Sequence, residues 1–262
     1  DFTTAIKLDP LNVHAYGNRG WAFQRKRDNN KALADYSKAI ELDPKEILGY
    51  INRGNVYRTM GNLDRAAADF HELGERAQKR GIKVGYEALA WGRHVSDYRD
   101  SWEVVRRADH PAIGLTLDSF HIFSRKTDLK AIRSIPGDRI VLVQLADAPW
   151  LDMDVMNWSR HFRCFPGQGE FPLTEFMDAV SATGYSGLLS LEIFNDQFRA
   201  GSPRSVAVDG QRSLVYLMDQ MRGASGALAK AAPEIPPRAK CLGVEFLEFA
   251  ADDHDAANLA RL

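Results

Sequence analysis

The chain has 262 residues, of which 45% are apolar and 26% charged, and its formal net charge is −1. These values suit a globular protein with one large domain or two small ones, and they argue against nucleic acid or an anionic membrane as a partner. No apolar run approaches the ~20 residues that span a bilayer, and no signal peptide is visible. The two cysteines, Cys164 and Cys241, lie far apart and form no zinc or disulfide pattern. We therefore expect a cytoplasmic protein.

The first seventy residues repeat themselves at an interval of 34. The repeated phrases are AIKLDP (5–10), AIELDP (39–44), YGNRG (16–20) and YINRG (50–54). Small residues at fixed positions would let paired helices approach, and aromatic residues would fill the space between them. This pattern resembles the tetratricopeptide repeat, a helix–turn–helix unit of the same length. The resemblance implies a groove for a protein or peptide partner over 1–70. The alternative is a packing scaffold whose aromatic residues are core.

Four short apolar runs follow, and each closes on a polar residue that carries a side-chain oxygen. The runs are IKVGYE (82–87), IGLTLD (113–118), IVLVQ (140–144) and GLLSLE (187–192). Helical stretches separate them, which favours βα units and a parallel sheet. In a βα barrel, the carboxyl ends of the strands converge on one mouth, where active sites lie. Oxygen donors suit a hard divalent cation, so we expect a Mg²⁺ or Mn²⁺ site there.

The sequence from about residue 86 onward resembles bacterial 3-dehydroshikimate dehydratase, a member of the sugar-phosphate isomerase/epimerase group of TIM barrels. The phrases that carry the resemblance are YEALAWGRHV (86–95), LDSFH (117–121), VQLADAP (143–149), SRHFRCFPGQGE (159–170) and SLEIFNDQFRAG (190–201). The resemblance implies that a divalent metal is held by Glu87, Asp118, Gln144 and Glu192. Related sugar epimerases commonly have histidine in place of Gln144, which favours the dehydratase over a sugar isomerase or epimerase.

The same resemblance suggests roles for further residues. His121 occupies the position of the family's catalytic histidine, and an ordinary pKa near ~6.5 suits proton transfer. Either His121 or the ligand Glu87 would take the first proton. Arg163 would bind the carboxylate of a small-molecule substrate as a planar cation, and Ser159 would donate a hydrogen bond to it. The structural alternatives are a buried loop histidine, an arginine paired with a neighbouring carboxylate and an ordinary loop serine.

The expected fold class is α plus α/β, with tetratricopeptide hairpins joined to the second half of a TIM barrel. Helical repeats would span 1–70, and about four βα units of the barrel would span 71–222. A helix over 62–80 belongs to both patterns. A linker over 223–240 would then lead to the truncated start of a vicinal-oxygen-chelate module over 241–262, similar to 4-hydroxyphenylpyruvate dioxygenase.

Three hypotheses about function follow from this organisation. The first is metal-dependent dehydration of 3-dehydroshikimate to protocatechuate, in the catabolism of quinate and shikimate. Because the first half of the barrel would be absent, the sequence leaves the activity of the chain open. The second is an interaction module built on the repeats, with an inert barrel fragment. The third is an artificial join of two unrelated proteins near residues 66–69. The AAAD sequence at these positions is plausible both in the helical repeat and in the dehydratase-like sequence.

Overall fold

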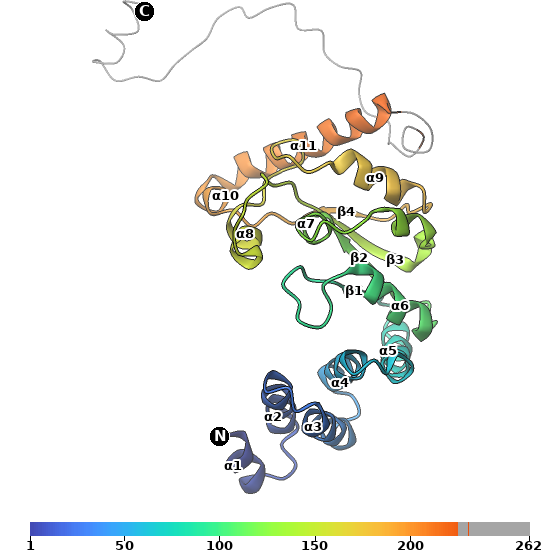
Figure 1. Ribbon diagram of the computed structural model, residues 1–262, viewed down its shortest axis with the longest axis vertical. Helices are drawn as coiled ribbons and strands as arrows, with labels where there is room; N and C mark the ends of the chain where they lie inside the picture. Colours follow the sequence, from blue (N-terminus) through green and yellow to red (C-terminus); the bar gives the residue numbers. More distant parts are fainter. Residues whose placement is uncertain (225–229, 231–262) are drawn as a thin grey trace, which may run out of the picture.

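The computed structural model describes residues 1–224 and Lys230. Helices make up the amino-terminal third of the chain, and a four-stranded sheet surrounded by further helices follows. Figure 1 shows the helices leading from the N-terminus toward the sheet. Within residues 1–224, we find no helix long and apolar enough to cross a membrane.

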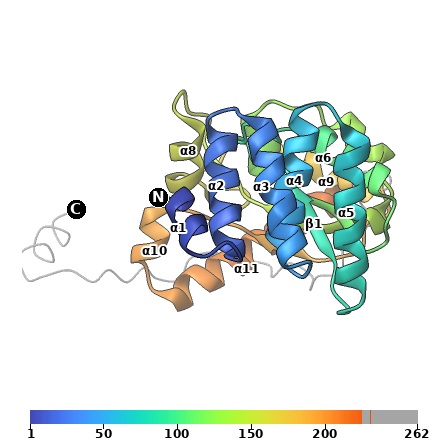
Figure 2. The same ribbon diagram turned by 90° about the horizontal axis from the view of Figure 1, so that it is seen from below.

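The 34-residue repeat forms two successive helical hairpins after a short first helix. The helices are α1 (Phe2–Leu8), α2 (Val13–Arg25), α3 (Asn29–Leu42), α4 (Ile47–Thr59) and α5 (Leu63–Gln78). Figure 2 shows α2 to α5 side by side. Each begins after a residue whose side-chain oxygen accepts a backbone N–H of the first turn, such as Asn12 before α2 and Asn62 before α5. Such caps satisfy donors that have no partner within the helix.

Each hairpin contains the same partly buried ion pair at equivalent repeat positions. Arg19 lies 2.7 Å from Asp35 in the first hairpin, and Arg53 lies 2.6 Å from Asp69 in the second. Both arginines bind the carboxylate with two nitrogens. Such bidentate geometry fixes the two side chains with respect to each other. The repeat in the sequence is therefore also a repeat of contacts.

The sheet consists of four parallel strands in the order in which they occur in the chain. They are β1 (Val84–Glu87), β2 (Ile113–Asp118), β3 (Ile140–Leu145) and β4 (Leu189–Leu191). All three pairings are parallel. A closed βα barrel has eight such strands, so the described residues form a partial barrel.

Helices connect the strands and cover the sheet. They are α6 (Tyr98–Ala108), α7 (Ser119–Ser124), α8 (Val155–His161), α9 (Leu173–Ser181), α10 (Asp196–Ala200) and α11 (Pro203–Gly223). Two short 3₁₀ turns, Lys130–Ser134 and Gly137–Arg139, precede β3. One core cluster contains residues of β2, β3, α6, α7 and α9, and reaches Leu217 of α11.

Helix α5 belongs to the hairpins and to the sheet domain at once. It packs on α4 as the second helix of a hairpin, and it also packs on α6. Phe70 and Leu73 of α5 lie in the same core cluster as the strand residues, and the Phe70 ring lies 4.5 Å from the ring of Tyr86 in β1. The Tyr86 hydroxyl donates to Asn55 of α4 at 2.6 Å. The boundary between the helical hairpins and the sheet region is thus a packed interface.

The four predicted strands are all present, and the predicted helix over 62–80 is α5. The helical hairpins form over 1–70, while their assignment to the tetratricopeptide family stays a prediction. The predicted module over 241–262, and the linker over 223–240 apart from residues 223, 224 and 230, lie outside the described residues.

Replacement of Phe70 by alanine tests whether the hairpins and the sheet are one cooperative unit. The Phe70 side chain is 3% exposed and fills the space between α5 and β1. We expect Phe70→Ala to lower the free energy of unfolding by about 3–5 kcal/mol, because a large buried ring leaves a cavity. Urea unfolding followed by circular dichroism would measure this loss.

Phe2→Ala is the matched control, since Phe2 holds the equivalent repeat position but is 41% exposed. We expect it to cost about 1 kcal/mol or less. Equal losses for the two variants would contradict the packing described here.

Candidate active site at the carboxyl ends of the strands

The strand register places the four predicted metal ligands on one face of the sheet. Asp118 at the end of β2 pairs with Gln144 of β3, and Gln144 in turn pairs with Ser190 of β4. Glu87 pairs with the residue two before Asp118. Glu192 follows Ser190 by two residues. Since side chains alternate between faces with a period of two, all four ligand candidates point to the same side.

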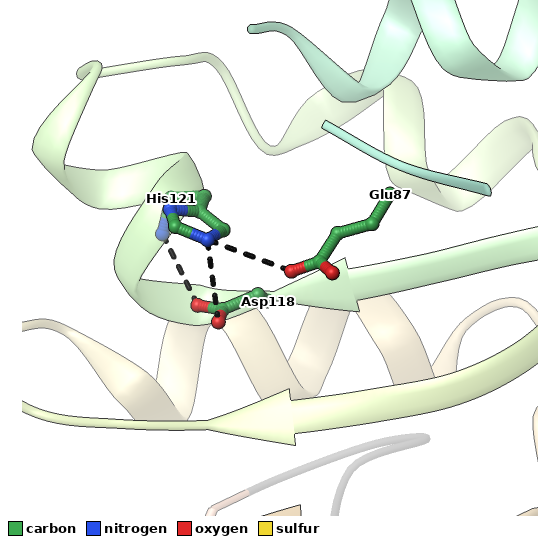
Figure 3. Close-up of side chains that lie close together, drawn as sticks. All are labelled: Glu87, Asp118 and His121. Atoms are coloured by element: carbon green, nitrogen blue, oxygen red, sulfur yellow. Dashed lines mark hydrogen bonds and ion pairs between the residues drawn. The ribbon is translucent and has the colours of Figure 1, made fainter. Parts of the chain in front are cut away.

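Asp118 also begins helix α7, and this sets the position of His121. The Oδ1 atom of Asp118 accepts the backbone N–H of His121 at 3.1 Å, as an N-cap. Figure 3 shows the result, with the imidazole next to both carboxylates. The Nε2 atom of His121 lies 3.5 Å from Oε1 of Glu87 and 3.8 Å from Oδ2 of Asp118. The ligand atoms of these three residues lie within 4.8 Å of one another, so they could hold a metal ion.

The hydrogen bond made by the Nδ1 atom of His121 indicates which tautomer the ring adopts. Nδ1 accepts the backbone N–H of Ala90 at 3.3 Å, which favours the neutral tautomer with its proton on Nε2. Arg163 Nη2, 3.4 Å from Nε2, is then not hydrogen-bonded to the ring, because both nitrogens carry hydrogen. A protonated nitrogen has no lone pair for a metal. In this arrangement His121 presents an N–H toward Glu87, and the oxygens of the carboxylates are the better ligands.

Arg163 neutralises the carboxylates from within the site. Its Nη1 atom donates to Asp118 Oδ2 at 2.8 Å and to Glu192 Oε2 at 2.8 Å. Its Nε and Nη2 atoms donate to Ser159 Oγ at 3.1 and 2.9 Å. The side chains of Arg163 and Asp118 are fully buried. Arg163 is therefore the counter-ion of two predicted ligands, which was the structural alternative for this residue.

Two oxygens at the site have no hydrogen-bond partner among the described residues. Glu87 Oε1 and Gln144 Oε1 are both buried and make no hydrogen bond, although His121 Nε2 lies 3.5 Å from Glu87 Oε1. A buried oxygen without a donor is costly, unless a ligand supplies a positive partner. Together with Asp118 and Glu192, these atoms make an oxygen-rich set that fits a hard divalent cation. Because Arg163 already lies between Asp118 and Glu192, such an ion would share these carboxylates with it.

The site shifts the pKa values of its titratable groups in opposite directions. Burial, with the charges of Asp118 and Glu192, raises the pKa of Glu87 to about 7. Burial lowers the pKa of His121 to about 4, and nearby Arg163 and Arg160 act in the same direction. His121 is thus neutral near pH 7, while Glu87 exchanges a proton there.

Arg163 also lowers the pKa of Asp118, against the upward effect of burial, so Asp118 is the ionised member of the cluster. Burial and the neighbouring Asp118 raise the pKa of Glu192. The three carboxylates therefore do not share their negative charge equally.

Sequence reasoning missed Asp147, two residues beyond the last strand residue of β3. Its carboxylate accepts the backbone N–H groups of Ala148, Gly167 and Phe171 at 2.8 to 2.9 Å, and it is 2% exposed. Its own backbone pairs with that of Cys164, next to Arg163. Asp147 thus holds the loop that carries Arg163 into the site. An aspartate between two alanines just after a strand was the available signal.

A cavity of about 1130 Å³, lined in part by residues of α7, α8 and α9, lies away from this cluster. Its walls come from the segment after α7, the loop after β3, and α9, and none of the predicted site residues lines it. The cavity shares Trp158 with the core beneath the site.

Comparison with known proteins assigns the family. The model of the xylose isomerase-like TIM barrel family matches residues 5–217. The chain therefore belongs to the xylose isomerase-like TIM barrel family, and its four parallel strands are part of that barrel.

Three known proteins illustrate the similarity of this chain to its relatives. A 3-dehydroshikimate dehydratase of Pseudomonas putida is 57% identical over 192 residues, which is 71% of this chain and 30% of that protein. The chain thus spans about 30% of the length of this relative. A solved xylose isomerase-like TIM barrel/4-hydroxyphenylpyruvate dioxygenase fusion protein is 53% identical, with a TM-score of 0.63, over 76% of this chain and 33% of that one. The IOLI protein, solved with a binding zinc atom, is 18% identical with a TM-score of 0.55, over 74% of this chain and 71% of that one, and it supports the fold alone.

Removing the positive charge of Arg163 should destabilise the protein. Arg163→Met leaves Asp118 and Glu192 without their counter-ion, and Asp118 is fully buried. Breaking a buried ion pair on one side costs about 3–5 kcal/mol, so we expect a loss of that size in urea unfolding.

Arg199→Met removes an arginine whose pair with Asp196 is exposed, and it should cost about 0–1 kcal/mol. If Arg163→Met were as stable as this control, the carboxylates would not depend on Arg163.

Proposed function

We propose that the chain carries the metal and proton-transfer site of a 3-dehydroshikimate dehydratase. The observation that supports this most is the cluster at the strand ends, where Glu87, Asp118, Gln144 and Glu192 share one face beside His121. The similarity to the 3-dehydroshikimate dehydratase of Pseudomonas putida supports the choice of substrate in this proposal. The described residues supply four of the eight strands of a barrel.

The reaction removes water from a β-hydroxy ketone, so a proton next to the carbonyl must leave first. A divalent ion held by the carboxylates and by Gln144 would supply positive charge that stabilises the enolate oxygen. We infer Mg²⁺ or Mn²⁺ from the oxygen donors. Gain of an aromatic ring in protocatechuate supplies the driving force.

The proton steps are assigned to Glu87 and His121. Glu87 is the carboxylate of the cluster that accepts no hydrogen bond from Arg163, and burial beside Asp118 and Glu192 raises its pKa, so it is the group that can accept a proton. Glu87 then returns this proton to the departing hydroxyl, which leaves as water, while the adjacent N–H of His121 donates a hydrogen bond to that oxygen. Arg163 and Ser159, the substrate contacts expected from the sequence, are bonded to each other, and Arg163 is already paired with Asp118 and Glu192. We therefore assign them to holding the cluster in place.

A coupled measurement of metal binding and turnover tests this function. With Mn²⁺ or Mg²⁺ and 3-dehydroshikimate, the chain should form protocatechuate, followed by its absorbance, and a chelator should stop the reaction. His121→Gln should lower kcat by about 10²–10⁴-fold and leave metal affinity nearly unchanged, because the imidazole that assists departure of the hydroxyl is lost while the oxygen ligands stay. Turnover that is indifferent to chelation would contradict the proposal, and so would the lack of product with either metal.

Asp118→Asn should weaken metal binding by about tenfold or more in calorimetry, because the ionised ligand loses its charge. Asp196→Asn is the control, since Asp196 is a carboxylate outside the cluster that pairs with His161 and Arg199. We expect no change in metal affinity for this variant.

A second function is favoured by a groove in the hairpin region. A cavity of about 360 Å³ is lined by residues of α2 and α4 at equivalent repeat positions, including Asn18 and Asn52. The exposed Trp21 also lines it. We propose that a short peptide of a partner protein binds here, with the two amides holding its backbone.

Screening a library of short peptides against the full chain would test the groove. A peptide that binds should lose about tenfold or more in affinity with Asn18→Ala or Asn52→Ala, because each amide can make two hydrogen bonds to a peptide backbone. The exposed Asn30 lies outside the groove, so Asn30→Ala should have no effect. Peptide binding that ignores both groove variants would rule out this site.

A further inference from the structure

Three arginines surround the ring of Phe194, which follows β4 on the rim of the site. The guanidinium carbons of Arg160, Arg163 and Arg199 lie 5.0, 5.3 and 5.8 Å from its centre. The three arginines differ in whether a carboxylate neutralises their charge. Arg163 is neutralised by Asp118 and Glu192, and Arg199 lies 3.1 Å from Asp196. Within residues 1–224, no carboxylate lies at ion-pair distance from Arg160. Its positive charge is therefore available at this rim.

Arg160 is held in place by aromatic rings from opposite ends of the sheet. Its guanidinium carbon lies 5.6 Å from the ring centre of Trp91, in the loop after β1, and 5.0 Å from that of Phe194, in the loop after β4. Cations over aromatic faces at these distances are attracted electrostatically. Arg160 extends from α8 and bridges the loops of the first and last strands, while it stays exposed to solvent.

The held guanidinium lies close to the reacting groups. The Trp91 ring meets the His121 ring edge-on, with centres 4.9 Å apart. The positive charge of Arg160 is one of those that lower the pKa of His121. Arg160, Trp91 and His121 thus follow one another from the rim into the site.

Arg163 is poorly placed to take a further anion. Its Nη1 atom already donates to two carboxylates and to the backbone oxygen of Glu192 at 3.1 Å. Its remaining nitrogens face Ser159 and His121, and the side chain is fully buried. A third carboxylate would place three negative charges around one cation. A substrate carboxylate gains more from a cation that lacks an anion.

We propose that Arg160 is the specificity residue that binds the carboxylate of the substrate, with Trp91 and Phe194 holding its guanidinium plane. The inference rests on the proposed function and names the group that recognises the acid of that substrate. Arg163 then keeps its place as counter-ion of Asp118 and Glu192. The planar fork of an arginine matches a carboxylate with two parallel hydrogen bonds.

A comparison of two unreactive ligands tests this role in the full chain, without turnover. The ligands are 3,4-dihydroxybenzoate and 3,4-dihydroxybenzamide, which differ in the negative charge, and calorimetry would measure both affinities. The benzoate should bind about tenfold or more tightly than the amide, since a charge-assisted hydrogen bond is worth more than a neutral one. Arg160→Gln should abolish this preference, and Arg160→Lys should retain part of it.

Arg199→Gln is the matched control, because Arg199 also lies over Phe194 but is paired with Asp196. It should keep the full preference for the acid. The inference is overturned if the preference survives Arg160→Gln, if Arg199→Gln removes it equally, or if the wild-type chain shows no preference.

Turnover separates this inference from the proposed function. With 3-dehydroshikimate, Arg160→Gln should raise KM about tenfold or more and change kcat little, because the contact is made with the bound substrate as well as with the transition state. If the chain turns nothing over but keeps an Arg160-dependent preference for the acid, the carboxylate site stands and the dehydratase does not. If the chain turns the substrate over and Arg160→Gln leaves KM unchanged, the dehydratase function stands and the carboxylate site at Arg160 does not.

Discussion

The buried guanidinium of Arg163 is the contact on which the site depends. It joins Asp118 at the end of β2 to Glu192 beyond the end of β4, across the intervening strand β3. Without a positive charge there, Asp118 would be a fully buried anion, and the cost of burying it alone would be several kcal/mol. Asp147 supports the same contact from outside, because it fixes the loop in which Arg163 lies. Charge balance and loop geometry therefore act together.

The position of Arg163 between Asp118 and Glu192 limits which oxygens a metal ion could use. A divalent ion and Arg163 are both cations, and both would use oxygens of Asp118 and Glu192. The unpaired oxygens of Glu87 and Gln144 lie on the same face and offer the ion donors that Arg163 does not use. An enzyme with this site would divide its carboxylates between a fixed internal cation and an exchangeable one. The proposed contact of the substrate is then a separate cation at the rim, Arg160.

The fold places this site beside a helical array without a linker between them. The last helix of the array, α5, is also the first helix packed on the sheet, since Phe70 contacts Tyr86 of β1. A boundary within one helix makes the stability of the two regions interdependent. The family match, which runs from residue 5 to residue 217, spans both regions.

Local patterns determined much of this protein from the sequence alone. The 34-residue repeat predicted the hairpins, because equivalent residues such as Arg19 and Arg53 make equivalent contacts with nearby partners. The apolar runs predicted all four strands, and the period of two placed Glu87, Asp118, Gln144 and Glu192 on one face. His121 was predictable as well, because an N-cap at Asp118 fixes a residue three positions later.

Only the tertiary structure decided which charges neutralise one another. Arg163 and Asp118 are 45 residues apart, and Arg163 and Glu192 are 29 apart, so no local period relates them. The three arginines near Phe194 look alike in the sequence, yet Arg163 is buried between carboxylates and Arg199 is paired at the surface. Among the described residues, Arg160 has no carboxylate at ion-pair distance. Coulomb energies depend on the distance and burial of groups in space, and both are properties of the folded chain.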